Sequence, residues 1–412
     1  MAKSFKVEEW DKIYSQLDGN DHLYDLPAKS SNSIVFGSWN IRHFGEFWDG
    51  DTPKRSAGST KLIVKFCERC DLIALQEVKA SLSSVRNLLN TLNQNTTRDY
   101  KLLSSDITGR VPGKKKKGMK ERSTFIYDSA KITLGEVISD LNIDQTEIIA
   151  NVNKAIKATH ANFARTNAIA KTKGWVSGKW LATSLLVRGR LKKFITLIRS
   201  PYLITIKVHG NDGASYDLSI VNTHLQYGTE KEREREFFYL LEWLVHSTNN
   251  PTDMEPPLTI LMADLNLTFG KSNSKRRDAI AKTVSDYNSK MNSNRQLRVN
   301  FPFLDEHPTK GIIKTNARLS ETFDHISTFS RGENRFPWAR YNNTAGQHGV
   351  EGFDYGVFNF VKLFQDAGFA RETDGKIDVS KFDFDVSDHM PIYLRMPIPD
   401  ASQPTYSEDG IS

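Results

Sequence analysis

Side chains that can bind a metal or move a proton follow short apolar runs at six places in this 412-residue chain. Taken singly, each has an ordinary explanation, because Asp and Asn commonly form turns after strands and a lone histidine is usually structural. Recurrence at six strand ends indicates one site, provided that those ends share a sheet edge. The six groups are Asn40, Glu77, His224, Asp264 with Asn266, Asp324, and Asp388 with His389.

Carboxylates in such positions require partners. Asp264 and Asn266 are two residues apart, so they share one face if the strand continues. A buried carboxylate is costly unless a cation or an imidazole neutralises it. Mg²⁺ prefers carboxylate, amide and water oxygens, and an imidazole moves protons near neutral pH. The set therefore predicts metal binding combined with acid–base chemistry.

The elements that must position these groups are short runs rich in β-branched and aromatic residues, which are typical of buried strands. Helical patterns lie between some of them, and this mixture predicts an α/β sandwich with helices outside packed sheets. The predicted strands are Ile34–Trp39, Leu72–Leu75, Thr124–Tyr127, Tyr202–Val208, Leu218–Thr223, Leu258–Met262, Phe323–Thr328 and Pro391–Leu394. The predicted helices are Ser59–Cys70, Ser81–Asn93 and Glu230–His246.

The same pattern of predicted strands and helices suggests where the main domain begins and ends. Residues 1–32 are predicted to be an N-terminal extension made of a short helix and a linker. Residues 33–398 form the main domain, with basic insertions near 142–193 and 271–298, and 399–412 form a tail. Two cysteines, Cys67 and Cys70, would share a helix face, and one such pair favours reduced thiols over a zinc or redox site.

Charge favours a polyanionic partner. The net charge is +7, and the 64 positions from Ile148 to Asn211 contain 12 Lys or Arg and no acid. A further basic run is Lys114–Lys117. A solvated face also explains a charge run, and Trp175 and Trp180 could either stack on bases or pack their insertion to the core. No stretch has the roughly 18 apolar residues of a membrane span, and the first residues lack a signal-peptide pattern, so we expect no membrane partner and a cytoplasmic location.

The motif order resembles that of the endonuclease/exonuclease/phosphatase superfamily across residues 34–394. The motifs are Asn, Gln-Glu-Val, Thr-His-Leu, Asp-Leu-Asn, Phe-Asp-His-Ile and Ser-Asp-His-Met-Pro. Two further segments, Lys120–Tyr127 and Ile198–Tyr202, resemble the deoxyribonuclease-I-like branch in particular. The resemblance implies an α/β (α+β) fold, a four-layer sandwich of two packed mixed β-sheets with outer helices, with the active site at one end.

The resemblance also implies a Mg²⁺ site, with Mn²⁺ or Ca²⁺ as alternatives. Asn40 and Glu77 would hold the cation, and Asp388 would either assist them or pair with an imidazole. Asp264 would orient or deprotonate the attacking water. Asn266 would donate hydrogen bonds to the scissile phosphate.

Both histidines would act as donors to the phosphate or as general acid, each paired with a carboxylate. By resemblance, His224 pairs with Glu121 and His389 pairs with Asp324. Arg199 would contact phosphate, for which a guanidinium fork is suited.

Three positions qualify the resemblance. Lys79 matches a basic residue that enters the groove of DNA, although a solvated surface lysine is the alternative. Ala263 stands where relatives usually have Gly. Phe323 replaces an aromatic that often carries a hydroxyl, so a phosphate contact would be missing.

The predicted activity is metal-dependent hydrolysis of nucleic acid, with DNA ahead of RNA, by an endonuclease of little sequence specificity. The alternative is a phosphoinositide or other phosphate-ester phosphatase of the same superfamily, since substrate choice lies in the loops. That alternative would favour an exposed apolar lip, which the sequence lacks. A non-catalytic binding protein is disfavoured, because every expected acid, amide and imidazole is present.

Overall fold

The computed structural model describes most of the chain. Lys114–Lys117, Trp175, Trp180, the insertion 142–193 and residues 400–412 lie outside the described residues. The described ranges are 4–28, 31–45, 55–108, 120–141, 199–226, 228–249, 256–269, 274–307, 310–332, 354–370 and 382–399, with 197, 372–373, 376–377 and 379. All elements below belong to one compact unit, Met1–Asp140 with Ile198–Ser412.

Two mixed six-stranded sheets form the centre of this unit. In the first sheet the order is β13-β16-β1-β2-β4-β3, and β1 and β2 run parallel while the other neighbours are antiparallel. Its strands are β1 (Ser33–Phe44), β2 (Leu72–Lys79), β3 (Tyr100–Ser104), β4 (Glu121–Asp128), β13 (Asp354–Val357) and β16 (Ile392–Pro397).

The second sheet has the order β5-β6-β7-β8-β12-β9, and β7 and β8 are its parallel pair. Its strands are β5 (Ile132–Asp140), β6 (Tyr202–His209), β7 (Ser215–His224), β8 (Leu258–Asp264), β9 (Leu297–Asn300) and β12 (Asp324–Arg331). Short pairs β10 (Glu306–His307) with β11 (Gly311–Ile312) and β14 (Glu372–Thr373) with β15 (Lys376–Ile377) lie outside both sheets.

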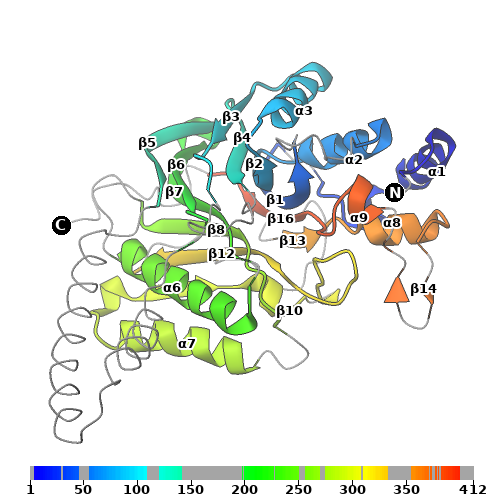
Figure 1. Ribbon diagram of the computed structural model, residues 1–412. Coiled ribbons are helices and arrows are strands. Elements are labelled where there is room, and N and C mark those ends of the chain that lie inside the picture. The colour runs from blue at the N-terminus through cyan, green and yellow to red at the C-terminus, as the bar shows by residue number, and fades with distance from the viewer. Residues whose placement is uncertain are drawn as a thin grey trace, which may run out of the picture. The chain divides into compact units, whose positions relative to one another are not determined.

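Helices cover the outer faces of the two sheets. Figure 1 shows α2 and α3 against the first sheet, with α6 and α7 against the second, so the layers run helix, sheet, sheet, helix. Every residue of β8 is buried, because this strand is covered on both faces. The predicted four-layer sandwich is confirmed. The helices are α1 (Val7–Leu17), α2 (Ala57–Cys67), α3 (Ser83–Asn95), α6 (Glu230–Asn249), α7 (Ser274–Asn288), α8 (Phe360–Asp366) and α9 (Phe382–Asp385).

All eight predicted strands and the three predicted helices are present, with some shifts in their ends. The largest shift is in β1, which continues to Phe44 rather than ending at Trp39. Helix α2 ends at Cys67 rather than Cys70, because residues 68–70 turn the chain into β2. Cys67 and Cys70 are both free and buried in the core. They therefore pack as small apolar side chains. In the described part of the basic insertion 271–298, Arg276 and Arg277 face acids on neighbouring segments.

The N-terminal segment contains the predicted short helix, α1, and packs into the core. Trp10, Ile13 and Leu17 on α1 belong to the main hydrophobic cluster, and the Trp10 ring contacts that of Phe364 on α8 at 5.6 Å. Asp25 then accepts a hydrogen bond of 2.8 Å from the Tyr393 hydroxyl on β16. The described residues of the predicted N-terminal extension thus pack against the first sheet and α8. Among the described helices, none has the length and apolar composition needed to cross a membrane.

Replacing Trp10 by Ala should lower the free energy of unfolding by about 3 to 5 kcal/mol, because the ring is 4% exposed and its removal leaves a cavity. Urea denaturation measures the change. Val7→Ala is the matched control on the same helix: Val7 is 72% exposed, so its loss should change stability by less than about 0.5 kcal/mol. Equal effects of the two substitutions would contradict the packing of α1.

Candidate active site

The register of the second sheet places three predicted site residues in one row. Asp264, at the end of β8, lies opposite His224 on β7 and opposite Asp324 on β12. Because β7 and β8 are parallel, both end at the same sheet edge. A short link then leads to Asn266, whose backbone N–H donates to Asp264 Oδ1 at 2.9 Å. The row is therefore fixed by backbone pairing.

The first sheet supplies Asn40 and Glu77 from its parallel pair β1 and β2. Asn40 Nδ2 donates to Asp264 Oδ2 at 2.8 Å and lies 3.4 Å from Glu77 Oε1. A second contact between the sheets joins Gln76 Nε2 to Asn222 Oδ1 at 2.8 Å. These amide contacts bring the two strand ends together in one polar cluster.

Backbone strain gathers at this cluster. Among the described non-glycine residues, five have positive φ, and three of them belong to the cluster: His43 (52°), Glu77 (56°) and Asn266 (50°). The pairing of β1 with β2 is irregular from Asn40 to Phe44, the stretch that contains His43. Left-handed backbone at a non-glycine residue costs energy and is concentrated at functional sites. The three left-handed residues therefore support a functional site at this sheet edge.

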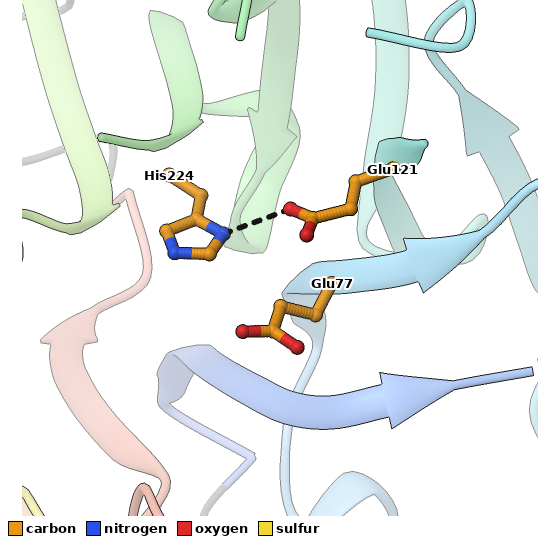
Figure 2. Close-up of side chains that lie close together, drawn as sticks. All are labelled: Glu77, Glu121 and His224. Carbon is orange, nitrogen blue, oxygen red and sulfur yellow. Dashed lines mark hydrogen bonds and ion pairs between the residues drawn. The ribbon is translucent and has the colours of Figure 1, made fainter. Parts of the chain in front are cut away.

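His224 is held by a carboxylate on the first sheet. Its Nδ1 lies 3.0 Å from Glu121 Oε2, and Figure 2 shows both side chains beside Glu77. Its Nε2 lies 3.4 Å from Asp264 Oδ2. Burial would raise the pKa of Glu121, but His224, Arg199 and Lys79 outweigh burial and hold that pKa well below its usual range. Because an ionised carboxylate only accepts hydrogen bonds, Nδ1 carries a proton and the ring orientation is fixed.

His389 is held in the same way from the other side. Its Nδ1 lies 2.8 Å from Asp324 Oδ2, and its Nε2 lies 3.6 Å from Asp264 Oδ2. Burial opposes charge on this imidazole, but the carboxylates of Asp324 and Asp264 prevail and raise the pKa of His389 well above its ordinary value. Both predicted histidine–acid pairs are thus confirmed as contacts. Both imidazoles also direct Nε2 at the same carboxylate oxygen.

Asp264 is fully buried and remains ionised. Burial alone would raise its pKa, but the imidazoles of His389 and His224 and the amide of Asn40 lower it. An ionised, desolvated carboxylate that faces two imidazoles is suited to accept or position a proton.

A cation fits beside Asn40 and Glu77. Asn40 Oδ1 is buried and has no hydrogen-bond partner among the described residues, which leaves an oxygen ready for a metal. Burial opposes charge on Glu77, but His224 and then Lys79 bring its pKa below the usual value. An amide oxygen next to an ionised carboxylate suits a hard divalent cation.

Two acid–histidine groups could also hold an ion, since the possible ligand atoms of each lie within 4.8 Å of one another. The groups are Glu77 with Glu121 and His224, and Asp264 with Asp324 and His389.

Asp388 lies at the margin of the cluster. Its side chain is 43% exposed and lies 3.7 Å from Arg42, whereas His389 is bonded to Asp324. Of the two predicted arrangements for Asp388, hydrogen-bonded pairing with an imidazole is not what the structure shows. A part in metal binding stays a prediction.

Arg199 and Lys79 both converge on Glu121. Arg199 Nε lies 2.8 Å from Glu121 Oε2, and Lys79 Nζ lies 3.7 Å from Glu121 Oε1. Lys79 is only 2% exposed, so the alternative of a solvated surface lysine is wrong. In this arrangement the two cations neutralise the acid that holds His224. Contact with phosphate stays a prediction for both.

Three contributors to the cluster were not predicted as site residues: Gln76, Asn222 and His43. Gln76 and Asn222 are almost fully buried and join the sheets. A signal was available for Asn222, because it lies two residues before His224 and therefore on the same face of β7. His43 carried no signal, because its approach to Glu77 depends on the left-handed backbone.

No family model matches the chain, but part of it is similar to known proteins. Over 105 residues it is 31% identical to deoxyribonuclease-1 of Oryctolagus cuniculus, covering 25% of this chain and 34% of that protein. Over 115 residues it is 30% identical to deoxyribonuclease gamma of Rattus norvegicus, covering 27% and 34%. The chain thus spans about a third of the length of these curated relatives.

A solved structure from Bacteroides thetaiotaomicron, described as an endonuclease/exonuclease/phosphatase family protein, aligns over 90% of this chain and 96% of its own at 12% identity, with a TM-score of 0.40. The two mixed sheets and the local similarity to deoxyribonucleases agree with the resemblance to the endonuclease/exonuclease/phosphatase superfamily. Over about a quarter of its length, the chain is similar to deoxyribonuclease I.

Asp324→Asn should lower the pKa of His389, because it removes the nearest charge that favours the imidazolium. A raised folded pKa stabilises the fold fully below the unfolded value of about 6.5, and this stability is lost as pH rises through the folded pKa. The stability gap between wild type and variant should therefore shrink at high pH. Histidine NMR titration of the metal-free protein measures the pKa, with Asp383→Asn as the control. A wild-type value near 6.5 would contradict the pairing.

Proposed function

We propose that this protein is a metal-dependent phosphodiesterase that cleaves nucleic acid, most directly DNA. The observation that carries the proposal is the arrangement at Asp264. Two buried imidazoles direct Nε2 at one ionised carboxylate oxygen, and Asn40 donates to the same oxygen from the facing sheet. Phosphodiester hydrolysis needs an activated water, neutralised phosphoryl charge and a stabilised leaving oxygen, and this cluster offers groups for each need.

The cation would be held by Asn40 Oδ1 and Glu77, which fit it as described above. When bound, it supplies charge neutralisation at the phosphoryl oxygens. Asp388 lies close enough to Arg42 to be restrained near this end of the sandwich, and we keep it as a further candidate ligand. Mg²⁺ is the proposed ion.

Protons are handled by the side chains around Asp264. Its ionised carboxylate would orient the attacking water and accept its proton. His389, whose pKa is raised, stays protonated near neutral pH and would donate to the phosphate or the leaving oxygen. His224, held by Glu121, would donate from the other side. Asn266 would complete the donors to the phosphate.

Nucleic acid is favoured by charge and by sequence similarity. The net charge is +7, and the segment from Ile148 to Asn211 contains no acid. The matched relatives are described as deoxyribonucleases, which supports DNA ahead of RNA. The ion pairs of Arg276 and Arg277 reduce the free positive charge on α7, so these bases support the proposal weakly. A phosphoinositide or other phosphate-ester phosphatase remains the second candidate.

The buried free thiols of Cys67 and Cys70 support a reducing compartment, and we include the cytoplasm in the proposal.

His224→Ala and Asp264→Asn should each lower DNA cleavage by about 10²- to 10⁴-fold, because each removes a group placed to move a proton. Plasmid nicking followed by gel electrophoresis measures the rate, and circular dichroism confirms folding. Lys207→Ala on β6 is the control, since that lysine pairs with Asp217 at the surface and should leave the rate unchanged. Near-normal cleavage by either site variant would refute the assignment.

Substrate class is tested by incubating the wild-type protein with Mg²⁺ and, separately, plasmid DNA, linear duplex, single-stranded DNA, RNA and inositol phosphates. We expect DNA to be degraded, EDTA to abolish the activity, and added salt to weaken it steeply, because phosphate contacts release counterions. Hydrolysis of inositol phosphates alone would favour the second candidate. Cleavage that is indifferent to EDTA would exclude the metal role.

A further inference from the structure

We propose that His43 is a further ligand of the divalent cation, through its Nδ1 atom. The inference rests on the proposed metal site at Asn40 and Glu77. It adds a nitrogen donor to a site whose other ligands are oxygens. His43 was not identified from the sequence.

The two oxygens of Glu77 face different neighbours. Oε1 lies 3.4 Å from Asn40 Nδ2, and Oε2 lies 3.5 Å from His43 Nδ1. Neighbouring ligand atoms around an octahedral ion with bonds of about 2.1 Å lie roughly 3 Å apart, so His43 Nδ1 needs to move by only about half an ångström to share an ion with Glu77. The side chain is 24% exposed, compared with 14% for Glu77. The Nδ1 atom itself is buried, so it faces the carboxylate and not the solvent.

Orientation of Glu77 does not require the His43 ring. The backbone N–H of His43 already donates to Glu77 Oε2 at 3.0 Å. That bond depends on the left-handed backbone of His43, with φ of 52°. The same backbone brings the imidazole to the carboxylate, at the position where the β1–β2 register shifts. Left-handed backbone at a residue other than glycine is concentrated at functional sites, which supports a role for this position.

A nitrogen ligand changes which metals the site prefers. Oxygen-only sites suit Mg²⁺, Ca²⁺ and Mn²⁺, whereas imidazole strengthens binding of later transition ions such as Co²⁺. With His43 as a ligand, the site should bind Co²⁺ much more tightly than Mg²⁺. Without the imidazole, that difference should shrink.

The test uses the whole 412-residue chain without nucleic acid, so that it does not depend on catalysis. His43→Asn is the central variant, because Asn tolerates left-handed backbone and retains the N–H bond to Glu77. His43→Gly provides a second variant with the same backbone freedom. Electron spin echo envelope modulation of the Mn²⁺-loaded protein detects directly bound nitrogen, and calorimetry with Co²⁺ and with Mg²⁺ measures affinity.

We expect nitrogen modulation in the wild type that is lost in both variants, with at least a tenfold weaker affinity for Co²⁺ and a Mg²⁺ affinity within twofold. Modulation that survives in His43→Asn, or equal loss of affinity for both ions, would overturn the inference while leaving the site at Asn40 and Glu77 intact. Failure of the wild type to bind any of these ions would instead refute the proposed metal site, and the inference with it.

Discussion

The site depends on the burial of one carboxylate. Asp264 has no exposed surface, and an ionised group in such a place is stable only when its neighbours neutralise it. Asn40, His224 and His389 meet that need from three directions. Each histidine is paired with its own acid, His224 with Glu121 and His389 with Asp324. Glu121 is in turn paired with Arg199 and Lys79, so a network of ion pairs extends outward from Asp264. The chemistry and the electrostatic stability of the fold therefore use the same contacts.

This network of ion pairs forms only if the two sheets are aligned in one fixed way, because its members come from both sheets. The pair formed by Gln76 and Asn222 provides this alignment, because Asn222 also donates to the backbone carbonyls of Leu75 and Thr124. Trp39 adds a bond from its indole nitrogen to the carbonyl of His389. Since each contact crosses between segments far apart in sequence, the alignment of the sheets is specified by directional bonds as well as by apolar packing.

Local pattern was sufficient for much of this architecture. The apolar runs predicted every strand that carries a predicted site residue, because such strands are buried on both faces, as in β8. It failed for β5, whose side chains are mostly exposed or half-buried. It predicted the N-terminal helix but not the packing of that helix against α8, which depends on contacts distant in sequence. Pairing of His224 with Glu121 followed from resemblance alone. The approach of His43 to Glu77 follows from backbone dihedrals, which no periodicity encodes.

Strand order has a consequence for synthesis of the chain. β16 is inserted between β1 and β13 in the first sheet, and the loop just before it carries His389. During synthesis, β1 therefore lacks its neighbour β16, which is made more than three hundred residues later. Until then the cluster around Asp264 lacks one imidazole. Synthesis from the N-terminal side thus completes this cluster only after His389 has been made.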